Sequence, residues 1–184
     1  MNVPWVNTQG TDVRGLLTFL STLFYPAAHY TTSEYTMTAE PHQGTERERV
    51  IEAVTTLFVS IDNRDWDAVR SCFTPKVLFN TTLTEGNPEI LPRDQIIGDW
   101  QEGLECLDAL HHQLGNFLVR FNENEVNVFC YGMAYHYLTT RSNRNTKLFV
   151  GSYDIRLVLQ DEVWKITAFT FNSKFIAGNL KLGE

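Results

Sequence analysis

Two long strand-like runs joined by a short polar segment constrain the fold of this chain most strongly. The runs are HHQLGNFLVRF at 111–121 and VNVFCYGMAYHYL at 126–138. Strand-like runs separated by so few polar residues are typical of an antiparallel hairpin. In the second run, small and apolar residues occupy every second position, and His136 falls in the same set. The pattern predicts that this strand turns one face, including His136, toward the core.

The length of the hairpin loop determines which residues of the two strands lie opposite each other. A three-residue loop at 123–125 places His112 opposite His136, whereas a four-residue loop places it opposite Tyr135. Because the alternation assigns His136 to the inner face, we predict the three-residue loop and two neighbouring imidazoles on that face. His111 is then expected on the outer face.

The residues before the hairpin have the periodicity of helices. Thr45 is a good N-cap, and the apolar residues of ERERVIEAVTTLFVSI (46–61) recur at the spacing of one buried helix face. Asp65 can cap a second, shorter helix over WDAVRSCF (66–73). A third helix is predicted over residues 93–110, directly after a proline.

Strands make up the rest of the predicted fold. Besides the hairpin, strand-like runs occupy KVLFNTTL (76–83), KLFVGSYDIRLVLQ (147–160) and VWKITAFTFNSKFI (163–176). Helices first and long antiparallel strands afterwards are typical of the α+β class. We therefore predict a cone-shaped, curved antiparallel β-sheet wrapped around the N-terminal helices and enclosing a cavity.

We expect one domain over residues 45–178, preceded by a weakly ordered extension, 1–44. The extension contains VRGLLTFLSTLFYPAA (13–28), whose apolar stretch is too short to cross a bilayer. Asp12 and the lack of a small-residue cleavage site argue against a signal peptide. Met37 is an alternative start that would keep all of the strong periodicity.

The charge and the cysteines exclude several classes of partner. The net charge is −7 and no cluster of Lys and Arg is present, so neither a nucleic-acid nor a membrane partner is expected. Cys72, Cys106 and Cys130 are widely spaced and form no C-x-x-C pair, which disfavours a disulfide framework and a zinc knuckle. A reducing, cytoplasmic location fits this pattern.

Four segments resemble the scytalone dehydratase family, in the family's own order. They are IDNRDWDAVRSCFTP (61–75), LHHQLGN (110–116), EVNVFCYGMAYH (125–136) and DEVWKI (161–166), and the resemblance extends over residues 45–175. It implies a SnoaL-like domain of the nuclear transport factor 2 superfamily. That superfamily also includes ketosteroid isomerases, bile-acid dehydratases, lindane dehydrochlorinase and the small subunits of ring-hydroxylating dioxygenases.

The resemblance implies roles for three residues. Asp62 corresponds to the aspartate that orients the catalytic base, His112 to the catalytic histidine and His136 to the second histidine. A buried base needs a partner that fixes its tautomer and stabilises its cation, so a carboxylate at a helix end beside two inward histidines fits this chemistry. The same three side chains could imitate a metal triad, but they lack its local spacing, and we predict neither metal nor cofactor.

Other positions depart from the family pattern. Scytalone dehydratase holds the substrate carbonyl through water with two tyrosines, and the matching positions here are Ile61 and Thr81, while Tyr153 stands at the position of a cavity asparagine. These differences predict a substrate other than scytalone. Tyr153 shares the alternation of an inner face, so its hydroxyl is either a donor to the substrate or a satisfied core group. Thr81 and Asn116 are the further candidate substrate-binding residues.

These observations together predict a cofactor-free lyase (dehydratase) or isomerase that acts on a small, apolar or ring-shaped, carbonyl-bearing substrate through a His-Asp general base. Two alternatives remain open, a small-ligand-binding module and an assembly subunit of the same fold. The outer face of the predicted sheet is aromatic enough to pair with another copy, so a homodimer or homotrimer is expected; its aromatic residues are Phe129, Tyr131, Tyr135 and Tyr137.

Overall fold

The computed structural model describes residues 44–183, except 82 and 84–86. Apart from Gly44, the predicted extension 1–44 lies outside the described residues. The elements are α1 (Glu46–Asp62), α2 (Trp66–Cys72), β1 (Phe73–Thr81), β2 (Glu89–Pro92), α3 (Arg93–Leu104), β3 (Ala109–Phe121), β4 (Val126–Tyr137), β5 (Thr146–Gln160) and β6 (Val163–Gly178).

The first two helices begin at the predicted caps. The Thr45 hydroxyl accepts the Glu48 N–H at 3.3 Å, and the Glu48 carboxylate accepts the Thr45 N–H at 2.7 Å, which forms a complete capping box. At α2, the Asp65 carboxylate accepts the Ala68 N–H at 3.0 Å. These hydrogen bonds confirm both predicted caps. The sequence can predict a cap because a cap depends only on neighbouring residues.

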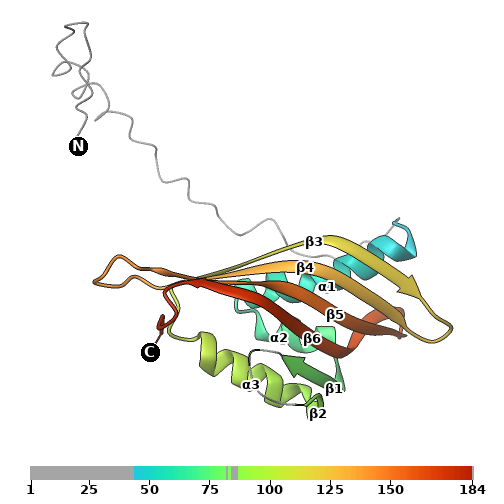
Figure 1. Ribbon diagram of the computed structural model, residues 1–184. Helices are drawn as coiled ribbons and strands as arrows, with labels where there is room; N and C mark the ends of the chain where they lie inside the picture. The colour runs from blue at the N-terminus through green and yellow to red at the C-terminus, as the bar shows by residue number, and fades with distance from the viewer. Residues whose placement is uncertain (1–43, 82, 84–86, 184) are drawn as a thin grey trace, which may run out of the picture. The chain divides into compact units, whose positions relative to one another are not determined.

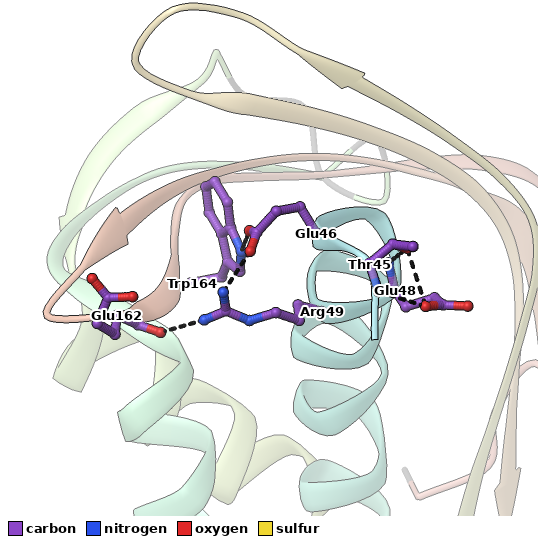
Figure 2. Close-up of polar contacts among 6 residues, drawn as sticks. All are labelled: Thr45, Glu46, Glu48, Arg49, Glu162 and Trp164. Atoms are coloured by element: carbon purple, nitrogen blue, oxygen red, sulfur yellow. Dashed lines mark hydrogen bonds and ion pairs between the residues drawn. The ribbon is translucent and has the colours of Figure 1, made fainter. Parts of the chain in front are cut away.

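The N-terminal end of α1 is fixed to the turn between β5 and β6 (Figure 2). The Arg49 guanidinium donates to the Glu162 backbone oxygen at 2.7 Å, and the Trp164 indole N–H donates to the Glu46 carboxylate at 3.3 Å. These contacts orient the helix along the sheet. Its C-terminal residue, Asp62, consequently lies where it can reach β3.

Six strands form one curved sheet in the order β2-β1-β6-β5-β4-β3. The helices lie on one face of this sheet (Figure 1). The α+β class is confirmed, with one difference from the predicted antiparallel sheet: β1 runs parallel to β6, and the other neighbours are antiparallel. Parallel neighbours need a long connection between them. Here α3 and the whole β3–β5 meander separate β1 from β6 in the sequence and provide that connection.

The core lies between the helices and the inner face of the sheet. Val50, Val54 and Leu57 of α1 have no exposed surface, as the helical spacing predicts. From the sheet, Val128 and Leu157 are 2% and 0% exposed. Each such side chain contributes about 1.5 to 3 kcal/mol by burial, so this apolar face stabilises the position of α1 more than its end contacts do.

The β3–β4 register differs from the predicted one by two residues. Phe121 pairs with Val126, so the loop has four residues (122–125) rather than three. A β-bulge between Gly115 and Leu118 adds a second shift of one residue. In the structure, Leu110 lies opposite His136 and His112 lies opposite Ala134.

Despite the two shifts, His112 lies on the predicted inner face of the sheet. A shift of one residue would turn His112 to the other face, whereas a shift of two returns it to the same face. Both histidines therefore line the same cavity, although they are diagonal rather than directly opposed. The His111 side chain is 70% exposed, so its predicted outer placement is confirmed, although its Nδ1 lies 4.0 Å from an oxygen of the Asp62 carboxylate.

The third helix is shorter than predicted. It ends at Leu104, and β3 begins at Ala109 instead of continuing the predicted helix to residue 110. Strand pairing prevails here, because the Asp108 N–H donates to the Tyr137 backbone oxygen at 2.8 Å. In the part of the chain that the structure describes, no helix is long and apolar enough to span a membrane.

Candidate active site

A cavity of about 280 Å³ lies between the helices and the inner face of the sheet. Aromatic and aliphatic side chains form most of its wall, and four polar side chains interrupt it. The lining residues are Phe58, Ile61, Phe79, Thr81, Leu83, Trp100, Leu104, His112, Ala134, His136, Phe149, Tyr153, Phe169 and Phe171. A largely apolar cavity with a few converging polar groups is the usual form of a small-molecule site.

The Asp62 carboxylate holds His112 by two contacts. One oxygen lies 2.6 Å from the imidazole Nδ1, and the other accepts the His112 backbone N–H at 2.8 Å. Because an ionised carboxylate can only accept, Nδ1 carries the hydrogen, and the lone pair of the neutral ring is on Nε2. His112 lines the cavity, so this arrangement gives the cavity a basic nitrogen of fixed orientation.

The segment after α1 explains why Asp62 reaches the sheet. Asn63 ends the helix, and Arg64 takes a left-handed backbone conformation with φ of 55°. The Arg64 guanidinium donates to the backbone oxygens of Leu104 at 3.3 Å and Leu107 at 2.5 Å. The end of α1 is thereby fixed to the segment that leads into β3, the strand that carries His112.

Little solvent reaches the Asp62–His112 pair. The side chain of His112 is 10% exposed and that of Asp62 is 16% exposed. Phe58 packs against the imidazole, with ring centroids 5.2 Å apart. Removal of water strengthens the interaction between the carboxylate and a protonated imidazole, since the effective dielectric constant is lower than in bulk water.

His136 is a second imidazole in the cavity, and it is neutral at pH 7. Burial, helped by the proximity of His112 and Lys147 and opposed by that of Asp62, lowers the pKa of His136 to about 4. Its ring packs on Phe149 with centroids 4.9 Å apart. A neutral imidazole can donate or accept a hydrogen bond without bringing a charge into an apolar site.

Tyr153 and Thr81 bring hydroxyl groups to the same cavity. Tyr153 is 5% exposed, and burial raises the pKa of its phenol above the usual range, so it stays a neutral donor. The Thr81 hydroxyl oxygen accepts the Leu83 N–H at 3.2 Å. The structure therefore gathers five of the six predicted site residues around one cavity, Asp62 through its contact with His112.

Asn116 is the sixth, and it does not line this cavity. It lies in the β-bulge of β3, is exposed, and has a left-handed backbone with φ of 57°. Its position gives no support to the predicted contact with a substrate. The physical role that the structure assigns to Asn116 is conformational, because asparagine tolerates the left-handed region better than most residues do.

Sequence reasoning missed the aromatic wall of the cavity. Trp100, for example, falls on the apolar stripe of α3, which predicts only that it is buried, and in the structure it lines the cavity. Helical spacing shows which face of an element is buried, but not whether that face meets another side chain or an open space. Among the described residues, no group of three or more His, Cys, Asp or Glu side chains is arranged to hold a metal ion.

Solved structures with the same fold share little sequence with this chain. A protein of Kribbella flavida is 18% identical, with a TM-score of 0.68 over 71% of this chain and 92% of its own. A protein of Novosphingobium aromaticivorans assigned as a scytalone dehydratase is 16% identical, with a TM-score of 0.64 over 72% and 86%. A hexachlorocyclohexane dehydrochlorinase of Novosphingobium barchaimii is 14% identical, with a TM-score of 0.59 over 74% and 91%.

At these identities the likeness concerns the fold alone. Among curated proteins, none matches this sequence significantly. The sequence of residues 43–170 does match the family of SnoaL-like domains, and this span includes α1 to β5 and the first part of β6. The chain therefore belongs to the SnoaL-like domain family.

Proposed function

We propose that this protein is a cofactor-free lyase or isomerase that removes a proton next to the carbonyl of a small, ring-shaped substrate. One observation carries the proposal: Asp62 holds the imidazole of His112 at 2.6 Å, which leaves its second nitrogen available to an apolar cavity. A base of this kind needs a fixed tautomer and a partner for its cation, and Asp62 supplies both.

In the proposed reaction, Nε2 of neutral His112 takes the proton from the carbon next to the carbonyl. The electrons of the broken C–H bond move toward the carbonyl oxygen and form an enolate. The negative charge of Asp62 stabilises the imidazolium that results. Such general-base transfer contributes about 10²- to 10⁴-fold to the rate.

His136 and Tyr153 are the proposed hydrogen-bond donors. Both are neutral at pH 7, so they can stabilise the enolate oxygen without repelling the imidazolium of His112. In a dehydration, the enolate electrons return to expel a hydroxyl group from the next carbon, which leaves as water with the abstracted proton. In an isomerisation, the proton returns at another carbon. No electron is gained or lost overall in either case.

Two similar structures support a proton-abstracting reaction. They belong to proteins assigned as a scytalone dehydratase and a hexachlorocyclohexane dehydrochlorinase, and both names describe eliminations. Loss of water is our first choice and tautomerisation our second. We also propose that the protein works in the cytoplasm, where its three free cysteines would stay reduced.

The proposal can be tested without knowledge of the natural substrate. Cyclohexanone and tetralone, a fused two-ring ketone, are incubated with the protein in deuterium oxide, and loss of the proton signal next to the carbonyl is followed by NMR. We expect exchange above the buffer rate with the native protein and exchange at the buffer rate with His112→Gln. Binding of either ketone with no accelerated exchange would instead favour a ligand-binding module.

A further inference from the structure

Two paired glycines lie in the middle of the inner face of the sheet. Gly132 of β4 is directly opposite Gly151 of β5. Neither has a positive φ, so the backbone conformation does not explain the choice of glycine at either position. The explanation lies in the side chains that pack on them.

The ring of Tyr153 occupies the space where a side chain of residue 132 would lie. A Cβ placed on Gly132 would be 2.2 Å from Cε2 and 2.9 Å from Cδ2 of Tyr153, and 3.2 Å from Cδ2 of Leu114. Real contacts to Cβ are much longer than the first two distances. The Tyr153 ring therefore rests on bare backbone at Gly132.

The ring of Phe171 packs on Gly151 in the same way, with one difference. Its Cβ would be 2.7 Å from Cε2 of Phe171, but also 2.3 Å from the backbone oxygen of Asn172. A side chain at 151 would force strands β5 and β6 to move. At Gly132 the two closest obstacles are atoms of one side chain, so a substitution there acts first on Tyr153.

Three other rings of the cavity wall pack against Tyr153 and limit its sideways movement. Phe58 and Phe169 lie 4.7 Å and 5.5 Å from it between ring centroids, and Phe171 lies 4.8 Å away. The sheet lies beneath the ring, and the cavity is the open side. A methyl group at position 132 would push the ring toward the cavity.

We propose that Gly132 is a specificity-determining residue: by seating Tyr153 against the sheet, it makes the cavity deep enough for a fused two-ring substrate. The inference rests on the proposed function for the class of substrate. The volume supports it, because an apolar protein cavity of about 150 Å³ accepts a single benzene ring, and this cavity measures about 280 Å³.

The test compares Gly132→Ala with a matched control, Gly115→Ala. Gly115 lies on the adjacent strand β3, and a Cβ there would have no atom within 4 Å. Binding of cyclohexanone and tetralone is measured by calorimetry. For Gly132→Ala we expect tetralone to bind about tenfold or more weakly and cyclohexanone to change by less than about threefold, while Gly115→Ala changes neither. Equal weakening of both ketones, or no weakening, would overturn the inference.

Two further measurements keep the inference independent of ligand choice and of folding. If the native protein binds neither ketone, the proposed substrate class fails, and a crystal structure of Gly132→Ala still decides: a Tyr153 ring displaced into the cavity supports the inference, and an unmoved ring refutes it. If Gly132→Ala alone does not fold, Gly132→Ala with Tyr153→Leu should fold, because leucine lacks the clashing Cε2 atom. A double variant that is equally unfolded would contradict the proposed contact.

Discussion

At the scale of single residues, the Asp62–His112 pair is the feature on which the proposed chemistry depends. Asp62 binds both the ring and the backbone of His112, with distances of 2.6 and 2.8 Å. One carboxylate thus fixes the position, the orientation and the tautomer of the base. A substitution that keeps the size of Asp62 and removes its charge separates positioning from cation stabilisation.

We predict that Asp62→Asn and His112→Gln each lower the rate of proton exchange by about 10²-fold or more, since each removes the working base or its cation partner. The double variant should be little worse than the worse single variant, because groups that act as a unit are not additive. Exchange is followed by NMR, and circular dichroism melting serves as the folding control.

Independent losses that multiply in the double variant would contradict the idea of one functional unit. Exchange at the native rate in His112→Gln would remove His112 as the base. A loss of activity with EDTA that a divalent metal restores would instead favour metal chemistry at these residues.

His136 makes the stability of the fold depend on pH. Its pKa is about 4 in the folded protein against an ordinary value of 6.5. As the pH falls below 6.5, the unfolded chain takes up this proton first, so the folded state loses stability until the pH reaches about 4. The free energy of unfolding therefore decreases as the pH falls.

We predict that His136→Gln reduces this pH dependence. Between pH 7 and pH 5, the free energy of unfolding of the native protein should fall by roughly 2 kcal/mol more than that of the variant. Urea unfolding at both pH values measures the difference, in which the contributions of other titrating groups largely cancel. Parallel curves for the two proteins would show that His136 is not buried as a neutral group.

At the scale of elements, local signals could be predicted from sequence and the strand register could not. The caps at Thr45 and Asp65 depend on neighbouring residues, so the sequence contains all the information they need. The bulge at Asn116 depends on how two strands twist and pack over their whole length. Alternation still assigned His112 to the correct face because the two errors of register compensated.

The bulge offers a direct test of this account. Deleting Asn116 removes the extra residue of β3, so the part of the strand before it must shift by one position and turn His112 away from the cavity. We predict loss of proton exchange together with a lower melting temperature for the deletion. Asn116→Gly should keep both properties, because glycine adopts the left-handed conformation freely. A deletion variant with native exchange would show that the bulge does not set the register of His112.

At the scale of the whole molecule, one face of the sheet has no covering layer among the residues that the structure describes. The helices lie on the other face (Figure 1). Tyr131 and Tyr137 on β4 are 43% and 40% exposed, and Leu118 on β3 is 56% exposed. An apolar surface of this kind marks an interaction site in most proteins. We propose that a second copy of the chain covers it.

The proposed assembly can be measured in solution. Light scattering at micromolar concentration should report a homodimer or homotrimer for the native protein, and Leu118→Lys should yield monomer because it buries a charge in the proposed interface. Val59→Lys is the matched control, since Val59 is 51% exposed but lies on α1, away from the sheet surface. A native protein that is monomeric would refute the assembly. Equal disruption by both lysines would show that copies associate through a surface other than the outer face of the sheet.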